Sequence, residues 1–152
     1  MDLITYISAS VIAYLGLVSG LLLAYSNLDE LKPGRKYFIL IQKMILAAII
    51  ILAFCMLPAF NSVLLSVLAF AVATFVFFAE LPLAVTYFVL GAAFYLSSIN
   101  NSSFAAMAAL IFLFGIPSGT LSNSTEQGKL KSNFKELAYC LGFFICIILF
   151  LL

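Results

Sequence analysis

The hydrophobic and polar positions of this chain fall into long blocks. Residues 3–25 carry no charge, and a helix of that length crosses a hydrocarbon core of roughly 30 Å at about 1.5 Å per residue. The polar stretch 26–36 includes Pro33-Gly34, a pair typical of turns, so we expect a loop there. Residues 37–57 form a second apolar block that ends at Pro58. The pattern predicts two membrane-crossing helices joined by this polar loop.

The next apolar block, residues 59–96, is too long for one crossing at about 1.5 Å per residue. Its only charge and a proline coincide at Ala79-Glu80-Leu81-Pro82. Proline removes a backbone donor and crowds the preceding turn, so we expect a break there. The elements expected from here on are helices over 61–79 and 82–96, a loop over 97–103, a helix over 104–116 before Pro117, a loop over 118–135 and a helix over 136–152.

These elements predict an all-α fold, a polytopic integral membrane protein with about six transmembrane helices in a single bundle domain, residues 1–152. The helices over 61–79 and 82–96 are short for a full crossing. The alternative for them is a re-entrant hairpin. Backbone at that depth is tolerated only where it is buried in protein or lines water.

Composition supports the membrane assignment. Hydrophobic residues make up 66% of the chain, charged residues 9%, and the mean hydropathy is +1.26, whereas soluble domains are about half apolar and about a quarter charged. We therefore expect the partner that covers the surface to be the lipid bilayer of the cell membrane. A net charge of +1 without a basic stripe excludes a nucleic-acid partner.

The residue types argue against an enzyme. Histidine is absent, which removes the commonest general base and metal ligand. The three cysteines, Cys55, Cys140 and Cys146, have no metal-ligand spacing and are expected to be small buried hydrophobes. We predict no catalytic residue, cofactor or metal.

Basic residues predict the orientation. Lys32, Arg35 and Lys36 form one cluster, and Lys129, Lys131 and Lys135 form another. Loops rich in Lys and Arg stay on the cytoplasmic side, so an even number of crossings is expected between the clusters. Both termini are then outside. Asn100 and Asn101 match the N-glycosylation pattern on the same outer side, although chance matches are common in Ser/Asn-rich stretches.

Three polar residues are candidates for an intramembrane site. Glu80 is the only acidic residue within the embedded stretch, and we expect it at the cytoplasmic interface, capping the next helix. In a re-entrant hairpin it would instead lie deep, as a proton or cation site. Lys43 is expected to extend toward the headgroups, and the alternative is an ion pair with Glu80 assisted by Gln42.

Small residues on the first helix predict close packing. Gly16 and Gly20 form a GxxxG motif that Ala24 extends by one turn, and such residues let helix backbones approach. The partner is either another helix of the chain or a second subunit.

The leading functional hypothesis is therefore a non-enzymatic protein that acts through helix packing, as an accessory subunit of a membrane complex or as a homo-oligomer through its first helix. The alternative is a small transporter or channel for protons, cations or a small solute that uses Glu80 and Lys43.

Overall fold

The computed structural model describes residues 2–26, 28–56, 63–78, 81–99 and 101–124, together with residues 143, 144 and 148. Within these ranges the fold is all-α, as predicted. The five helices are α1 (Leu3–Ser26), α2 (Leu28–Cys55), α3 (Val63–Phe78), α4 (Leu83–Ile99) and α5 (Asn101–Ser124).

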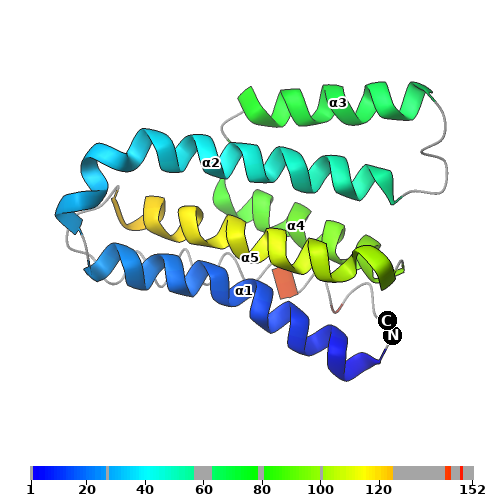
Figure 1. Ribbon diagram of the computed structural model, residues 1–152, viewed down its shortest axis with the longest axis horizontal. Helices are drawn as coiled ribbons and strands as arrows, with labels where there is room; N and C mark the ends of the chain where they lie inside the picture. The colour runs from blue at the N-terminus through cyan, green and yellow to red at the C-terminus, as the bar shows by residue number, and fades with distance from the viewer. Residues whose placement is uncertain are drawn as a thin grey trace.

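Helix α5 is the centre of the bundle. It packs against α1, α2 and α4, whereas α3 lies outermost and packs mainly on α2 (Figure 1). Helices α1 and α5 run parallel, since Tyr6 stacks near Phe104 and Gly20 lies near Ile116. Helix α2 runs in the opposite direction (Figure 1). The start of α2 and the end of α5 therefore lie at the same end of the bundle.

The contact between α1 and α5 is made by glycines on both helices. A methyl group added to Gly16 would come within 2.8 Å of the Phe112 Cα atom, and one added to Gly119 within 2.7 Å of the Leu21 backbone nitrogen. One added to Gly115 would lie 3.0 Å from the Gly16 Cα atom. Because no other residue lacks a Cβ atom, only glycine permits this approach.

An aromatic cluster fills the space between α1, α4 and α5. It consists of Tyr6, Tyr14, Tyr87, Phe94, Phe104, Phe114 and Phe143. Ring centroids of neighbouring members lie 4.9 to 6.5 Å apart, the range in which aromatic pairs attract beyond their area burial. Phe143 is fully buried. A residue far beyond α5 in sequence thus belongs to the core.

The loop predicted over 26–36 is wrong. Only Asn27 separates the two helices, and α2 already begins at Leu28, so Pro33 and Gly34 are helical. Pro33 removes one backbone hydrogen bond close to the helix start, where interruption is least costly.

The loop predicted over 97–103 is also wrong, since α4 continues to Ile99 and α5 begins at Asn101. Serine hydroxyls here bond back to their own helix, Ser97 to the Phe94 carbonyl at 2.6 Å and Ser98 to the Tyr95 carbonyl at 2.7 Å. A serine satisfied in this way needs no water. Polar composition was therefore a misleading loop signal.

The predicted end of the fifth helix at Pro117 is wrong as well, because α5 continues through this proline to Ser124. Proline removes only the bond to the carbonyl of residue 113. The hydroxyls of Ser118 and Thr120 donate to the carbonyls of Phe114 and Pro117, at 2.8 and 2.9 Å. The close packing of Gly115 and Gly119 on α1 also favours the continuous helix.

Six membrane crossings are not supported. Within the described ranges, three helical segments are long and apolar enough to cross a membrane, namely Leu3–Ser26, Gly34–Cys55 and Ser103–Leu121. Helices α3 and α4 are apolar but shorter, with 16 and 17 residues. The helix predicted over 136–152 lies outside the described residues except for 143, 144 and 148, which are helical.

The glycine contact predicts a stability difference between glycines of the same chain. Gly115→Ala should lower the free energy of unfolding by about 1–3 kcal/mol, the usual effect of overpacking. Gly34→Ala is the matched control, because its methyl would sit at an ordinary 3.5 Å from the Phe38 ring. Thermal unfolding in mild detergent measures both. Equal stability of the two variants would contradict the close α1–α5 approach.

Candidate functional site

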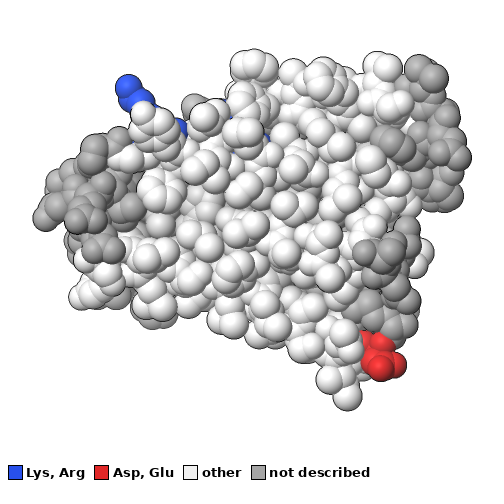
Figure 2. Space-filling view, viewed as in Figure 1, with Lys and Arg blue, Asp and Glu red and all other residues white. Residues whose placement is uncertain are grey.

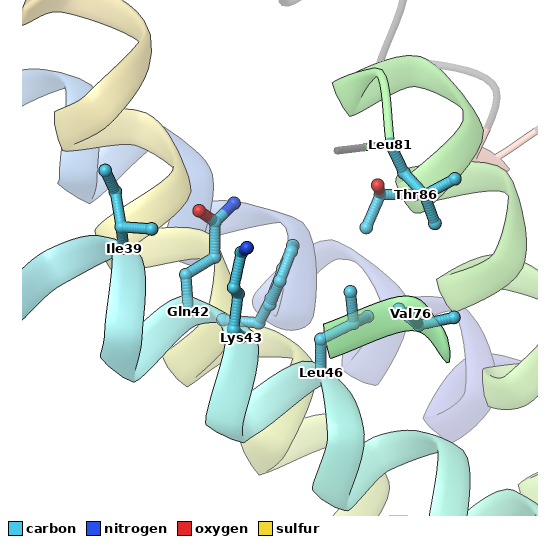
Figure 3. A pocket seen from close by; sticks show the side chains of 8 residues that line it. Ile39, Gln42, Lys43, Leu46, Val76, Leu81 and Thr86 are labelled. Atoms are coloured by element: carbon cyan, nitrogen blue, oxygen red, sulfur yellow. The ribbon is translucent and has the colours of Figure 1, made fainter. Parts of the chain in front are cut away.

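A cavity of about 200 Å³ lies between α2, α3, α4 and α5 (Figure 3). Its lining combines three polar side chains with five apolar ones. The lining residues are Gln42, Lys43, Thr86, Ile39, Leu46, Val76, Leu81 and Phe114.

The cavity is positioned by the junction of two short helices. Val76, near the end of α3, and Leu81, just before α4, line it together with Lys43 from the middle of α2. Helix α3 starts next to the end of α2 and runs back along it, so its last turn ends partway along α2 (Figure 1). Val76 and Leu81, which flank the connection between the two helices, therefore lie beside the interior of the bundle rather than at its end.

Lys43 lies deep in the second apolar segment. It is nine residues from Gly34, where this segment starts, which corresponds to about 14 Å along the helix axis. Its Nζ atom lies over the Phe77 ring, 5.9 Å from the centroid, within the range of a cation–π contact. The side chain is half-buried. Lys43 therefore points into the cavity region instead of extending to the end of the helix (Figure 3).

Gln42 links the cavity to α5. Its Nε2 atom donates a hydrogen bond to the Ser118 hydroxyl at 3.0 Å, and that hydroxyl donates to the Phe114 carbonyl at 2.8 Å. The single hydroxyl proton of Ser118 is thus committed to its own helix, so the serine oxygen has to accept from Gln42. This requirement determines which end of the Gln42 amide carries the nitrogen atom. Without a hydrogen-bond partner, the two orientations of a glutamine amide could not be distinguished.

Glu80 lies outside the described residues, as do Cys140 and Cys146. Among the residues with a described side chain the only carboxylate is that of Asp2, at the start of α1. Cys55 is a free, exposed thiol at the end of α2, not the buried hydrophobe that we expected. Within the described ranges no three His, Cys, Asp or Glu side chains gather as metal ligands would.

The small residues predicted on the first helix lie on its buried face. Gly16 and Gly20 contact the backbone of α5, and Ala24 is fully buried. This face is thus occupied within the chain itself.

The sequence did not indicate that Thr86 lines the cavity or that Ser118 links α5 to Gln42. Ser118 was assigned to a loop because it follows Pro117. The available signal was the second GxxxG motif, Gly115 to Gly119, which makes sense only on a helix that continues through the proline. Thr86 has no distinguishing signal, since it is one of many polar residues in apolar helices.

Comparison with known proteins gives no further lead: no protein-family model, curated protein or solved structure matches this chain.

The hydrogen bond between Gln42 and Ser118 predicts a measurable coupling. In a double-mutant cycle with Gln42→Leu and Ser118→Ala, we expect an interaction of about 0.5–1.5 kcal/mol in the free energy of unfolding, as for hydrogen bonds between helices in membranes. Ser19→Ala replaces Ser118→Ala in the control cycle, because the Ser19 hydroxyl donates to the Gly16 carbonyl of its own helix at 2.9 Å. Additive effects in both cycles would show that the α2–α5 bond is absent.

Proposed function

We propose that this protein is a non-enzymatic, multi-pass protein of the cell membrane that acts as a small transporter or channel, with the cavity at Gln42 and Lys43 as its solute site. The observation that carries the proposal is the position of Lys43, half-buried beside a polar-lined cavity in the middle of an apolar segment. Ionisable groups at such depth are costly in lipid and usually mark a solute or ion path.

The surface supports insertion into lipid. Large apolar side chains are exposed along the bundle, including Ile4 at 81% and Phe70 at 71%. On the face in Figure 2 the described surface is almost uncharged between Lys or Arg atoms near one end and Asp or Glu atoms near the other. Water would penalise such a surface, whereas lipid tails solvate it.

The proposed orientation has three crossings and one re-entrant hairpin. Helices α1, α2 and α5 cross, while α3 and α4 enter from the outer side and turn back beside Lys43. Two crossings, α2 and α5, then separate the basic clusters. Both clusters therefore lie on the cytoplasmic side, where loops rich in Lys and Arg are expected. Support comes from the shortness of α3 and α4 and from the place of their junction.

The role of accessory subunit ranks second. The GxxxG face of α1 is already occupied by α5, which removes the feature that favoured self-association through this helix. One observation still favours a protein partner. Helix α3 packs mainly on α2 and exposes Phe70, Phe75 and Phe78, each by 70% or more.

The proposed orientation predicts labelling from opposite faces. In a chain with all three cysteines replaced by alanine, single cysteines at Arg35 and Ser124 should react with an impermeant thiol reagent from the cytoplasmic face. Cysteines at Asp2 and Ile99 should react only from the outer face. Labelling of positions 35 and 124 from different faces would overturn the orientation and the hairpin together.

The transport proposal predicts that flux depends on Lys43 and not on a surface lysine of the same helix. Vesicles containing the protein are loaded in separate batches with labelled rubidium, chloride, phosphate or glycine. Lys43→Met should slow the efflux of the transported probe at least tenfold, because the charged contact of the half-buried lysine is lost. Lys36→Met, at an exposed position, should change efflux less than twofold. If none of the probes leaves faster than from protein-free vesicles, the transport role is refuted.

A further inference from the structure

The cavity at Gln42 and Lys43 has a definite chemical preference, and we infer that its ligand is a small anion. The inference rests on the proposed function for its transport role, although anion binding itself is independent of transport. The amide of Gln42, the cation of Lys43, the neutral oxygen atoms of the lining and the cavity volume together indicate this ligand.

The Gln42 amide offers a donor to the cavity. Its nitrogen carries two hydrogens, and one of them is used by Ser118. The amide cannot be reversed, because the Ser118 hydroxyl donates to Phe114 and has to accept from Gln42. In Figure 3 the side chains of Gln42 and Lys43 both extend from α2 toward the cavity that they line. The second amide hydrogen is therefore left for a ligand in the cavity that Lys43 also lines.

Lys43 adds the positive charge. Its Nζ atom contacts the face of Phe77, and among the described side chains no carboxylate lies beside it, since Asp2 belongs to the far end of α1. A ring face attracts a cation but leaves its hydrogen-bond donors unused. Charge-assisted hydrogen bonds to an anion are the stronger way to use them.

The lining suits a cation poorly. Among the described lining side chains the oxygen atoms belong to Gln42 and Thr86, and both are neutral. The Thr86 hydroxyl donates to the Pro82 carbonyl at 3.3 Å. A second cation in this cavity would lie beside Lys43 without a described carboxylate to offset the repulsion. The remaining lining is apolar, which strengthens any electrostatic contact by excluding water.

The volume fits a small anion rather than a large one. At about 30 Å³ for each water molecule in the liquid, a cavity of about 200 Å³ holds roughly six or seven waters. Chloride with part of its hydration shell, a carboxylate or a phosphate fits in this space. The headgroup phosphate of a lipid offers the same chemistry, so the experiment has to separate a dissolved anion from a lipid.

Ion selectivity tests the inference. The protein is reconstituted into bilayers of neutral phosphatidylcholine, and the reversal potential is measured under a potassium chloride gradient. We expect a reversal potential with the sign that chloride selectivity produces. Lys43→Met should lower the conductance at least tenfold. Lys43→Arg should retain part of the conductance, and Lys36→Met should retain all of it. Gln42→Glu should abolish the chloride current, since the carboxylate replaces the amide donor and neutralises Lys43, whereas Gln42→Leu should only reduce it.

Equilibrium binding separates this inference from the transport role. Binding of labelled phosphate to the purified protein in neutral detergent should weaken at least tenfold in Lys43→Met. Binding that depends on Lys43 without any conductance would refute transport and support the anion site. If only anionic lipid is retained, as seen by native mass spectrometry, the site takes the lipid phosphate and the dissolved-anion inference fails. Cation selectivity, or loss of the current in Glu80→Gln with no effect of Lys43→Met, would overturn the inference.

Discussion

The structure depends on the close approach of α1 and α5. Glycines on both helices bring the two backbones together so tightly that a methyl group at Gly16 or Gly119 would collide with the backbone of the partner helix. In lipid this packing replaces the hydrophobic driving force, because lipid tails are as apolar as the side chains. With α1 fixed on one side of α5, the other sides of α5 are left for α2 and α4. The central position of α5 therefore follows from its glycines.

The same contact explains how the polar link to the cavity is built. Gly115 and Gly119 both face α1 only if α5 stays helical across Pro117, and that continuity places Ser118 opposite Gln42. The hydroxyls of Ser97, Ser118 and Thr120 bond to carbonyls of their own helices. Such bonds let polar residues remain in apolar helices without water. The hydrogen bond from Gln42 to Ser118 then joins the site to α5.

The extent of the apolar blocks could be predicted from the sequence. A helix in the hydrocarbon core of a bilayer needs apolar side chains along its whole length, so every residue of the helix contributes to the pattern. The first helix and the helix after Asn61 were placed within a few residues. The polar stretches at 26–36 and 97–103 could not be assigned correctly. Composition does not reveal whether a serine bonds to water or to its own helix, and a proline near a helix start costs too little to end it.

For the candidate site, the sequence identified Gln42 and Lys43 because ionisable and amide groups are rare in apolar segments. Glu80, named for the same reason, lies outside the described residues. Ser118 and Thr86 could not be found, since their role depends on which helices become neighbours. That neighbourhood is decided by the packing of α5, a property of the folded bundle and not of any local pattern.

Helix α3 has a consequence for the choice of membrane. Its 16 residues span about 24 Å, less than a typical hydrocarbon core of roughly 30 Å, and it rests mainly on α2. In the proposed orientation, local bilayer thickness would act on α3 with little resistance from the rest of the bundle. Because Val76 and Phe77 of this helix adjoin Lys43, the shape of the cavity would then follow the thickness of the surrounding lipid.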